Sequence, residues 1–160
     1  MNPVKRVGLV AVLVVGVGLL GSTTAWAKPY SVAIQFTNVG DEPQASGVAS
    51  FKVLKVESER GLYWTYVNYS GTLTVWCGNL TPGATYRTPA GTFTADATGA
   101  GSASAKVTLT VIAYEGGQSP CIIDVVRLDP DGSSTTVLTG EFWGGVVSGL
   151  PVDDDQLPWF

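Results

Sequence analysis

From Tyr30 onward, apolar and polar side chains alternate in short segments that glycine, proline, asparagine or aspartate interrupts. Alternation with a period of two, rich in β-branched residues and bounded by turn signals, predicts half-buried strands. Eight strands are expected, near residues 31–37, 47–56, 62–68, 72–77, 91–95, 103–114, 121–128 and 135–142. No segment keeps the helical spacing of apolar residues over three turns.

Two of these segments indicate how the strands are joined and packed. Asp129-Pro130-Asp131-Gly132 separates two β-rich arms, and proline followed by glycine suits a tight turn, so residues 122–138 are expected to form a hairpin. Val107, Leu109 and Val111 alternate with mostly polar residues, which predicts one core face and one outer face. The expected fold class is all-β, an antiparallel two-sheet sandwich.

The apolar run at the start of the chain has a different pattern. Lys5 and Arg6 precede apolar residues 7–20, and Ala25-Trp26-Ala27 follows, which is the order of a secretory signal peptide cleaved after Ala27. An uncleaved anchor is the alternative, but a membrane span needs roughly 20 apolar residues. Cleavage makes the protein secreted, either extracellular or periplasmic, without a stable membrane span.

Three parts are therefore expected: a signal peptide over 1–27, a β-sandwich domain over 28–143 and a C-terminal tail over 144–160. Without Lys5 and Arg6, seven of the nine basic residues remain against 13 acidic ones, a formal net charge of −6. Such a surface repels phosphate backbones, so nucleic acid is not expected as a partner.

Cysteine and histidine content restrict the chemistry. Cys77 and Cys121 are the two cysteines, and a pair in an exported protein normally forms a disulfide, so the sequence predicts one bond and a melting temperature that falls under reductant. The chain has no histidine, which removes the Ser-His-Asp and Cys-His catalytic arrangements and the histidine-containing zinc sites. No catalytic residue, metal site or cofactor is predicted.

Paired carboxylates leave one enzymatic alternative, because a glycoside hydrolase needs only two acids across a sugar. The acids considered for this role are Glu57, Glu59, Asp96, Glu115, Asp124 and Glu141.

Aromatic residues give the strongest indication of a binding surface. Tyr63, Trp64 and Tyr66 lie close together, and Trp76 follows in the next expected strand. Exposed aromatic rings bind sugars by stacking on their apolar faces, so these four residues are the candidate ligand-binding set. The alternative is that Leu62, Trp64 and Tyr66 belong to the core and the other aromatic residues lie at a sheet edge.

Three segments resemble a known family. The sequences ASGVASF at 45–51, GNLTPGA at 78–84 and LTGEF at 138–142 are similar to the skeleton of CHRD-type domains, which are β-rich extracellular modules. Tyr86-Arg87-Thr88-Pro89 stands where that family usually has a His-x-His segment, so no histidine role carries over. Residues 80–101 also resemble Ig-like modules of bacterial surface proteins. Both resemblances imply a sandwich, and neither implies catalysis.

The sequence thus predicts a secreted, non-catalytic β-sandwich with a structural or binding role at the cell surface or outside the cell. A cell-wall polysaccharide or a surface protein is the expected kind of partner. A carbohydrate-binding module and a small carboxylate-dependent glycoside hydrolase remain alternatives.

Overall fold

The computed structural model of the chain describes residues 22–25 and 29–144. The residues expected to form the apolar part of the signal peptide, its cleavage site after Ala27 and positions 145–160 of the expected tail lie outside the described residues. No helix occurs in the described residues, and so none there could cross a membrane.

The described residues form ten strands. They are β1 (Ser22–Ala25), β2 (Tyr30–Asn38), β3 (Ser46–Arg60), β4 (Trp64–Gly78), β5 (Thr85–Thr88), β6 (Gly91–Thr94), β7 (Gly101–Tyr114), β8 (Gly117–Ser119), β9 (Cys121–Leu128) and β10 (Ser134–Phe142). All of the pairings are antiparallel, so the expected all-β, antiparallel class is confirmed.

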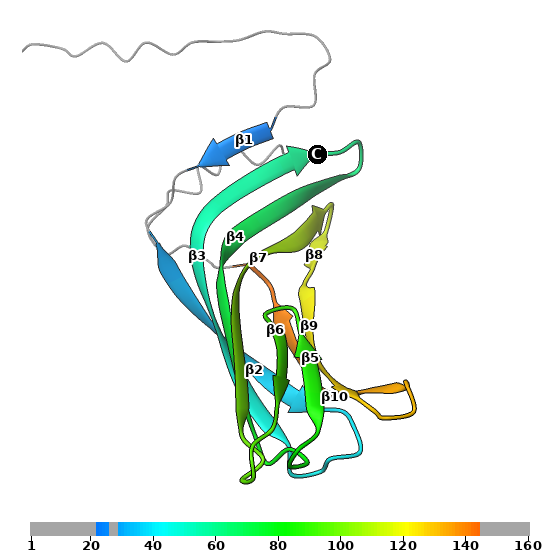
Figure 1. Cartoon of the computed structure of the whole chain (residues 1–160). Helices are drawn as coiled ribbons and strands as arrows, with labels where there is room; N and C mark the ends of the chain where they lie inside the picture. Colours follow the sequence, from blue (N-terminus) through cyan, green and yellow to red (C-terminus); the bar gives the residue numbers. More distant parts are fainter. Residues whose placement is uncertain (1–21, 26–28, 145–160) are drawn as a thin grey trace, which may run out of the picture.

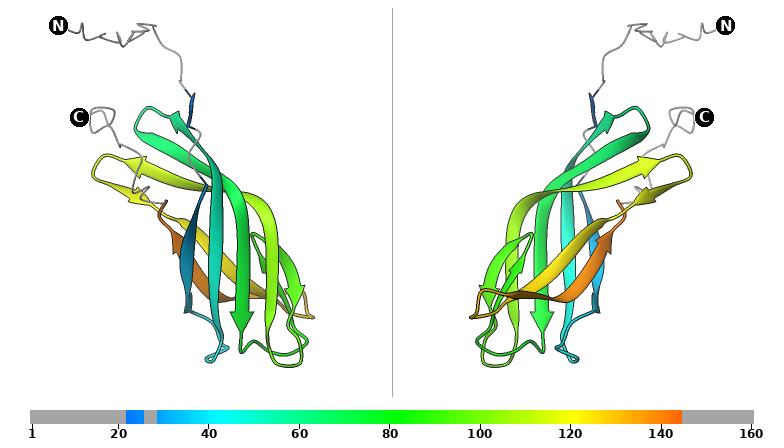
Figure 2. Two further views of the ribbon diagram at one scale, coloured as in Figure 1. Left: turned by 90° about the vertical axis from the view of Figure 1, so that its left-hand side faces the viewer. Right: turned by 90° about the vertical axis from the view of Figure 1, so that its right-hand side faces the viewer.

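The two separate sheets of a sandwich are not confirmed. The strands follow one hydrogen-bonded path, β6-β5-β9-β10-β2-β3-β4-β7-β8, with β1 paired to β3 beside it. The link between the expected sheets is the β10–β2 ladder, in which Leu138 lies opposite Asn38 and Gly140 opposite Phe36. The sheet curls strongly, so that β6 at one end contacts β7 near the other end (Figures 1 and 2).

One long strand replaces two expected ones. Residues 62–68 and 72–77 were expected as separate strands, yet β4 runs through both ranges and through Gly71 between them without interruption. A side chain at Gly71 would collide with the backbone oxygen of Lys52, close to the bulge where the β3–β4 register shifts between Val53 and Lys55. The glycine therefore allows a close approach of two backbones inside the sheet, and does not mark a turn.

The core lies on the concave side of the sheet. Leu73, Val75 and Cys77 are buried and alternate with outward-facing residues of β4. Phe142 packs edge-on against both Phe51 and Tyr69, with ring centroids 5.2 and 5.1 Å apart. All buried hydrophobic residues that the structure describes lie between Ile34 and Phe142, so residues 28–160 contain all of this core.

The hairpin predicted around Asp129–Gly132 joins β9 to β10. The N–H of Gly132 donates to the Asp129 carbonyl at 3.0 Å, and Gly132 has φ 87°, a conformation that glycine adopts without strain. The ends of β3, β4 and β7 project at the opposite end of the molecule, with β1 beside β3 and β8 beside β7 (Figure 1). That end carries most of the candidate ligand-binding residues.

Candidate functional site

The hairpin between β3 and β4 exposes a group of large apolar side chains. The N–H of Gly61 donates to the carbonyl of Trp64 at 2.7 Å, which closes a short loop between Arg60 and Trp64. Leu62 and Tyr63 therefore lie in the loop and are 83% and 74% exposed. Both were expected in a strand, and the hairpin geometry is the reason that they are solvent-facing.

Five large side chains at this end of the molecule, four of them aromatic, form a group that we call the aromatic tip. The tip consists of Leu62, Tyr63, Trp64, Tyr66 and Tyr114. The Tyr63 and Trp64 ring centroids are 6.2 Å apart at 53°, and those of Trp64 and Tyr66 are 6.5 Å apart at 78°. These rings do not form one flat platform. They present differently inclined faces around Trp64.

Tyr114 belongs to the aromatic tip but is not among the ligand-binding residues predicted from the sequence. It ends β7 and lies opposite Trp64 in the β4–β7 ladder, and it is 48% exposed. Fifty residues of chain separate the two positions, so only the strand register brings them together. Its aromatic character was the one available signal.

Trp76 lies far from the other three predicted ligand-binding residues. It faces outward from β4 like Trp64, but it is twelve residues further along the strand, a separation of roughly 40 Å at 3.3 Å per residue. Between them the outer face of β4 and β7 is hydroxyl-rich, with Ser70 bonded to Thr108 at 2.9 Å and Thr74 to Ser104 at 2.8 Å. The four predicted residues therefore do not form one site: Tyr63, Trp64 and Tyr66 meet, and Trp76 stands apart.

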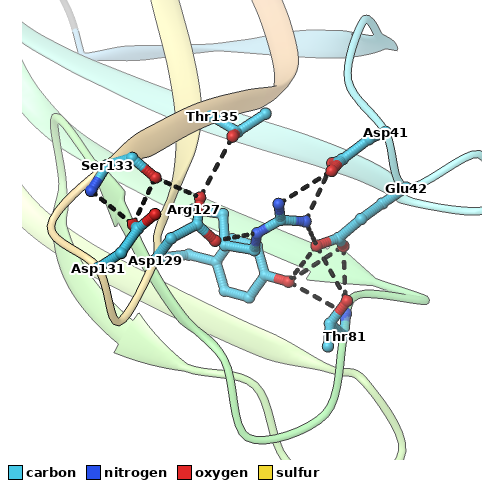
Figure 3. A network of polar contacts seen from close by, with 9 residues as sticks. Asp41, Glu42, Thr81, Arg127, Asp129, Asp131, Ser133 and Thr135 are labelled. Atoms are coloured by element: carbon cyan, nitrogen blue, oxygen red, sulfur yellow. Dashed lines mark hydrogen bonds and ion pairs between the residues drawn. The ribbon is translucent and has the colours of Figure 1, made fainter.

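A charged network lies at the opposite end of the molecule, around Arg127 of β9 (Figure 3). Arg127 binds both carboxylate oxygens of Asp41 at 3.0 and 2.9 Å, Glu42 at 2.8 Å and Asp129 at 2.7 Å. The Glu42 side chain is 8% exposed and also accepts hydrogen bonds from Tyr86 and Thr81. The network ties the loop after β2 to β9 and β5.

The surroundings of the network change the pKa of its members. Burial raises the pKa of Glu42, but hydrogen bonds from Arg127, Tyr86 and Thr81 together hold it below the ordinary value. The hydrogen bond from Arg127 is the largest cause that lowers the pKa of Asp41. Burial and the neighbouring Glu42 raise the pKa of Tyr86 to about 12. The carboxylates of Asp41 and Glu42 are thus charged in the folded state at neutral pH.

We expect the protein to lose stability in acid through these two carboxylates. A lowered folded-state pKa stabilises the fold above the ordinary pKa, and that contribution disappears as the pH falls through the folded-state value. The melting temperature should therefore fall progressively below pH 4.5, the ordinary pKa of glutamate. Thermal scans between pH 7 and pH 2 measure this. A melting temperature that does not change over that range would contradict the assignment.

The predicted disulfide is not confirmed, since Cys77 and Cys121 are both free in the structure. A backbone hydrogen bond from Thr110 places Cys121 beside that residue, and Thr110 lies opposite Asn68 of β4. Cys77 is nine residues further along the same strand, roughly 30 Å away. A disulfide requires Cα atoms within about 7 Å of each other, so this sheet keeps the two thiols apart.

Both thiols are accordingly expected to be free in the untreated protein, and reductant should leave the melting temperature unchanged. Burial raises the pKa of Cys77 to about 12, so its thiol stays protonated and unreactive at neutral pH. Maleimide labelling followed by mass spectrometry should modify Cys77 only after denaturation. If the untreated protein had a mass two hydrogens below that of the reduced chain, and reductant lowered its melting temperature, the predicted disulfide would be present after all.

Most of the carboxylates considered for a hydrolase are bound by neighbouring residues in the described part of the chain. Four of them have local partners: Glu57 binds Lys55 at 2.7 Å, Asp96 accepts hydrogen bonds from its own turn, Asp124 accepts one from Thr139 at 2.8 Å, and Glu141 accepts one from the indole N–H of Trp143 at 2.9 Å. A hollow of about 290 Å³ on the outer face has no carboxylate in its lining, which consists of Leu54, Ser70, Gly71, Lys106, Val107 and Thr108. Among the described residues, no group of three or more histidine, cysteine, aspartate or glutamate side chains is arranged to hold a metal ion.

Comparison with protein families, with curated proteins and with solved structures finds no match to this chain. The resemblance to CHRD-type and Ig-like domains therefore stays a prediction.

Proposed function

We propose that this protein is exported with cleavage after Ala27, and that it acts outside the cytoplasm as a non-catalytic binding protein. Its contact surface is the aromatic tip, and its ligand is a cell-surface or cell-wall polysaccharide. The exposure of Leu62, Tyr63 and Trp64 at the end of the projecting β3–β4 hairpin is the observation that carries the proposal.

Several features of the aromatic tip support a sugar ligand. Exposed aromatic faces stack on the apolar faces of sugar rings, and tyrosine and tryptophan add a polar group that can bond a hydroxyl. Glu59 lies opposite Tyr66 in the β3–β4 ladder and supplies a polar neighbour. The inclined rings suit a single polysaccharide chain or its end better than the flat surface of a crystalline polymer.

A pull-down experiment tests this proposal. Purified residues 28–160 are incubated with insoluble polysaccharides and cell-wall preparations, and the bound fraction is measured. Trp64→Ala should reduce retention by about tenfold or more, since a central aromatic contact in an interface is commonly worth at least 1.4 kcal/mol. Combining Tyr63→Ala with Trp64→Ala should abolish retention.

Trp76→Ala is the matched control. Trp76 is 47% exposed and Trp64 is 45% exposed, and both side chains face outward from β4. Retention should be unchanged in Trp76→Ala. Equal losses in the Trp64 and Trp76 variants, with both proteins folded by circular dichroism, would contradict the assignment to the aromatic tip. Absence of retention on every matrix would remove the polysaccharide as the ligand.

A further inference from the structure

Strand β3 pairs with β4 along one of its edges and with β2 along the other. β2 is too short to cover the whole of that second edge. β2 pairs with β3 only as far as Val53, which lies opposite Tyr30. Beyond the register shift near Lys55, β1 takes over this edge, with Ala25 opposite Val56 and Ser22 opposite Glu59. Four residues of β3, which we call the β3 edge (Val56–Glu59), are therefore paired on this side by β1.

β1 lies entirely before the expected cleavage site. This inference rests on the proposed function, in which residues 1–27 are removed on export. Cleavage after Ala27 removes every residue that pairs with the β3 edge, while β4 remains on the other side of β3. An unpaired edge presents backbone N–H and C=O groups that accept another strand.

The side chains around the β3 edge define what kind of strand fits it. Opposed residues of an antiparallel pair face the same side of a sheet, so Glu57 and Glu59 lie on the outer face with their partners Asn68 and Tyr66. In β1, Thr24 and Ser22 stand opposite these two glutamates. A strand with basic side chains at those two positions would form cross-strand pairs of opposite charge, with Glu59 directly and with Glu57 in addition to its own contact with Lys55.

We propose that the β3 edge of the mature protein binds an extended segment of a partner protein, antiparallel to β3, with basic side chains opposite Glu57 and Glu59. Backbone hydrogen bonds provide the affinity in this mode of recognition, and alternate side chains provide the specificity. The site adjoins the aromatic tip, since Glu59 lies opposite Tyr66. Export thus exposes a docking edge that the precursor's own β1 covers.

The first test compares two chains that differ only in β1. Residues 22–160 and 28–160 both contain the whole described core. Amide hydrogen exchange at the alternate residues of Val56–Glu59 whose N–H groups point toward β1 should be slow in the first chain and clearly faster in the second, because pairing protects amides. Amides of Val48–Val53, which face β2 or β4 in both chains, serve as the internal control. Equal exchange at Val56–Glu59 in the two chains would overturn the proposal.

The second test supplies a strand in trans. The probe is a synthetic peptide of residues 21–27, Gly-Ser-Thr-Thr-Ala-Trp-Ala, compared with a version carrying lysine in place of Ser22 and Thr24 and one carrying glutamate there. We expect the lysine peptide to bind 28–160 at least several-fold more tightly than the glutamate peptide, and Glu57→Gln with Glu59→Gln to remove the difference. The 22–160 chain should bind neither, because its edge is occupied.

Two N-methylated versions of the lysine-substituted peptide distinguish backbone pairing from binding through side chains. One is methylated at the backbone nitrogens of residues 22 and 24, and the other at those of residues 23 and 25. Only one set of amides points at β3 in an antiparallel ladder, so one peptide should bind and the other should not. Equal behaviour of the two would overturn edge pairing. If 28–160 dimerised as its concentration rose, and the dimer no longer bound the peptide, the β3 edge would pair with a second copy of this protein and not with a different partner.

The failure of the two proposals can be told apart. The amino-terminal sequence of the exported protein decides whether β1 is removed. Peptide binding by 28–160 depends on the β3 edge, and polysaccharide retention depends on Trp64. A Trp64→Ala variant that keeps peptide binding and loses retention would leave both proposals standing.

Discussion

Replacement of Arg127 by methionine is expected to lower the free energy of unfolding by about 3 kcal/mol. Methionine keeps an apolar side chain of similar length, but it leaves Asp41, Glu42 and Asp129 without the guanidinium that all three contact. The cost is largest for Glu42, which is 8% exposed and would remain charged in a mostly buried position. Urea denaturation of the variant and the parent protein measures the difference.

Lys55→Met is the matched control for the loss of an ion pair. Lys55 contacts Glu57 at 2.7 Å, but both side chains are more than one third exposed, so their pairing should contribute less than about 1 kcal/mol. Adding Glu42→Gln to Arg127→Met should recover part of the lost stability, because the buried group is then neutral. If Arg127→Met lowered the free energy of unfolding no more than Lys55→Met does, the charged network around Arg127 would not stabilise the fold.

Replacement of Phe142 by alanine is expected to cost about 3–5 kcal/mol of unfolding free energy. The Phe142 ring is 1% exposed and lies edge-on to both Phe51 and Tyr69, which belong to neighbouring strands β3 and β4. Phe142 reaches them from β10, so its removal opens a cavity between the two sides of the curled sheet. Denaturant and thermal unfolding with a near-ultraviolet signal from the aromatic residues check this result.

Trp143→Ala provides the neighbouring control. Trp143 is the next residue in the chain, and it is 46% exposed with its indole N–H donating to Glu141 at 2.9 Å. Loss of this larger but solvent-facing ring should cost less than about 1 kcal/mol. If Phe142→Ala were as mild as Trp143→Ala, the packing of β10 against β3 and β4 would not be the main contact that closes the sheet.

Local pattern predicted most strands because alternation is a property of neighbouring residues. The long β7 and the β9–β10 hairpin lie where the pattern places them. Two strands were predicted where β4 is one, because the close approach of the Lys52 backbone at Gly71 is not visible in the sequence. The four-residue strand β5 was missed, since its place depends on pairing with β6 and β9.

The candidate site was predictable only where its residues are close in the chain. Tyr63, Trp64 and Tyr66 gather at one hairpin, as their spacing suggested. Trp76 was included because it follows in the next expected strand, but that strand is the continuation of β4, so Trp76 lies far along it from Trp64. Tyr114 was missed, since its position opposite Trp64 depends on the β4–β7 register.

The sequence by itself determined the all-β class, the turns and the side of each strand that faces the core, because these follow from period-two alternation and from residues such as Gly132 with its positive φ. Only the tertiary structure decided that the strands join in one curled sheet, that Cys77 and Cys121 lie apart, and that Arg127 meets Asp41 and Glu42 across 86 and 85 residues. Those outcomes depend on which strand edges pair and in which register. That choice is made by the summed burial and hydrogen bonding of distant segments, which no local window of sequence contains.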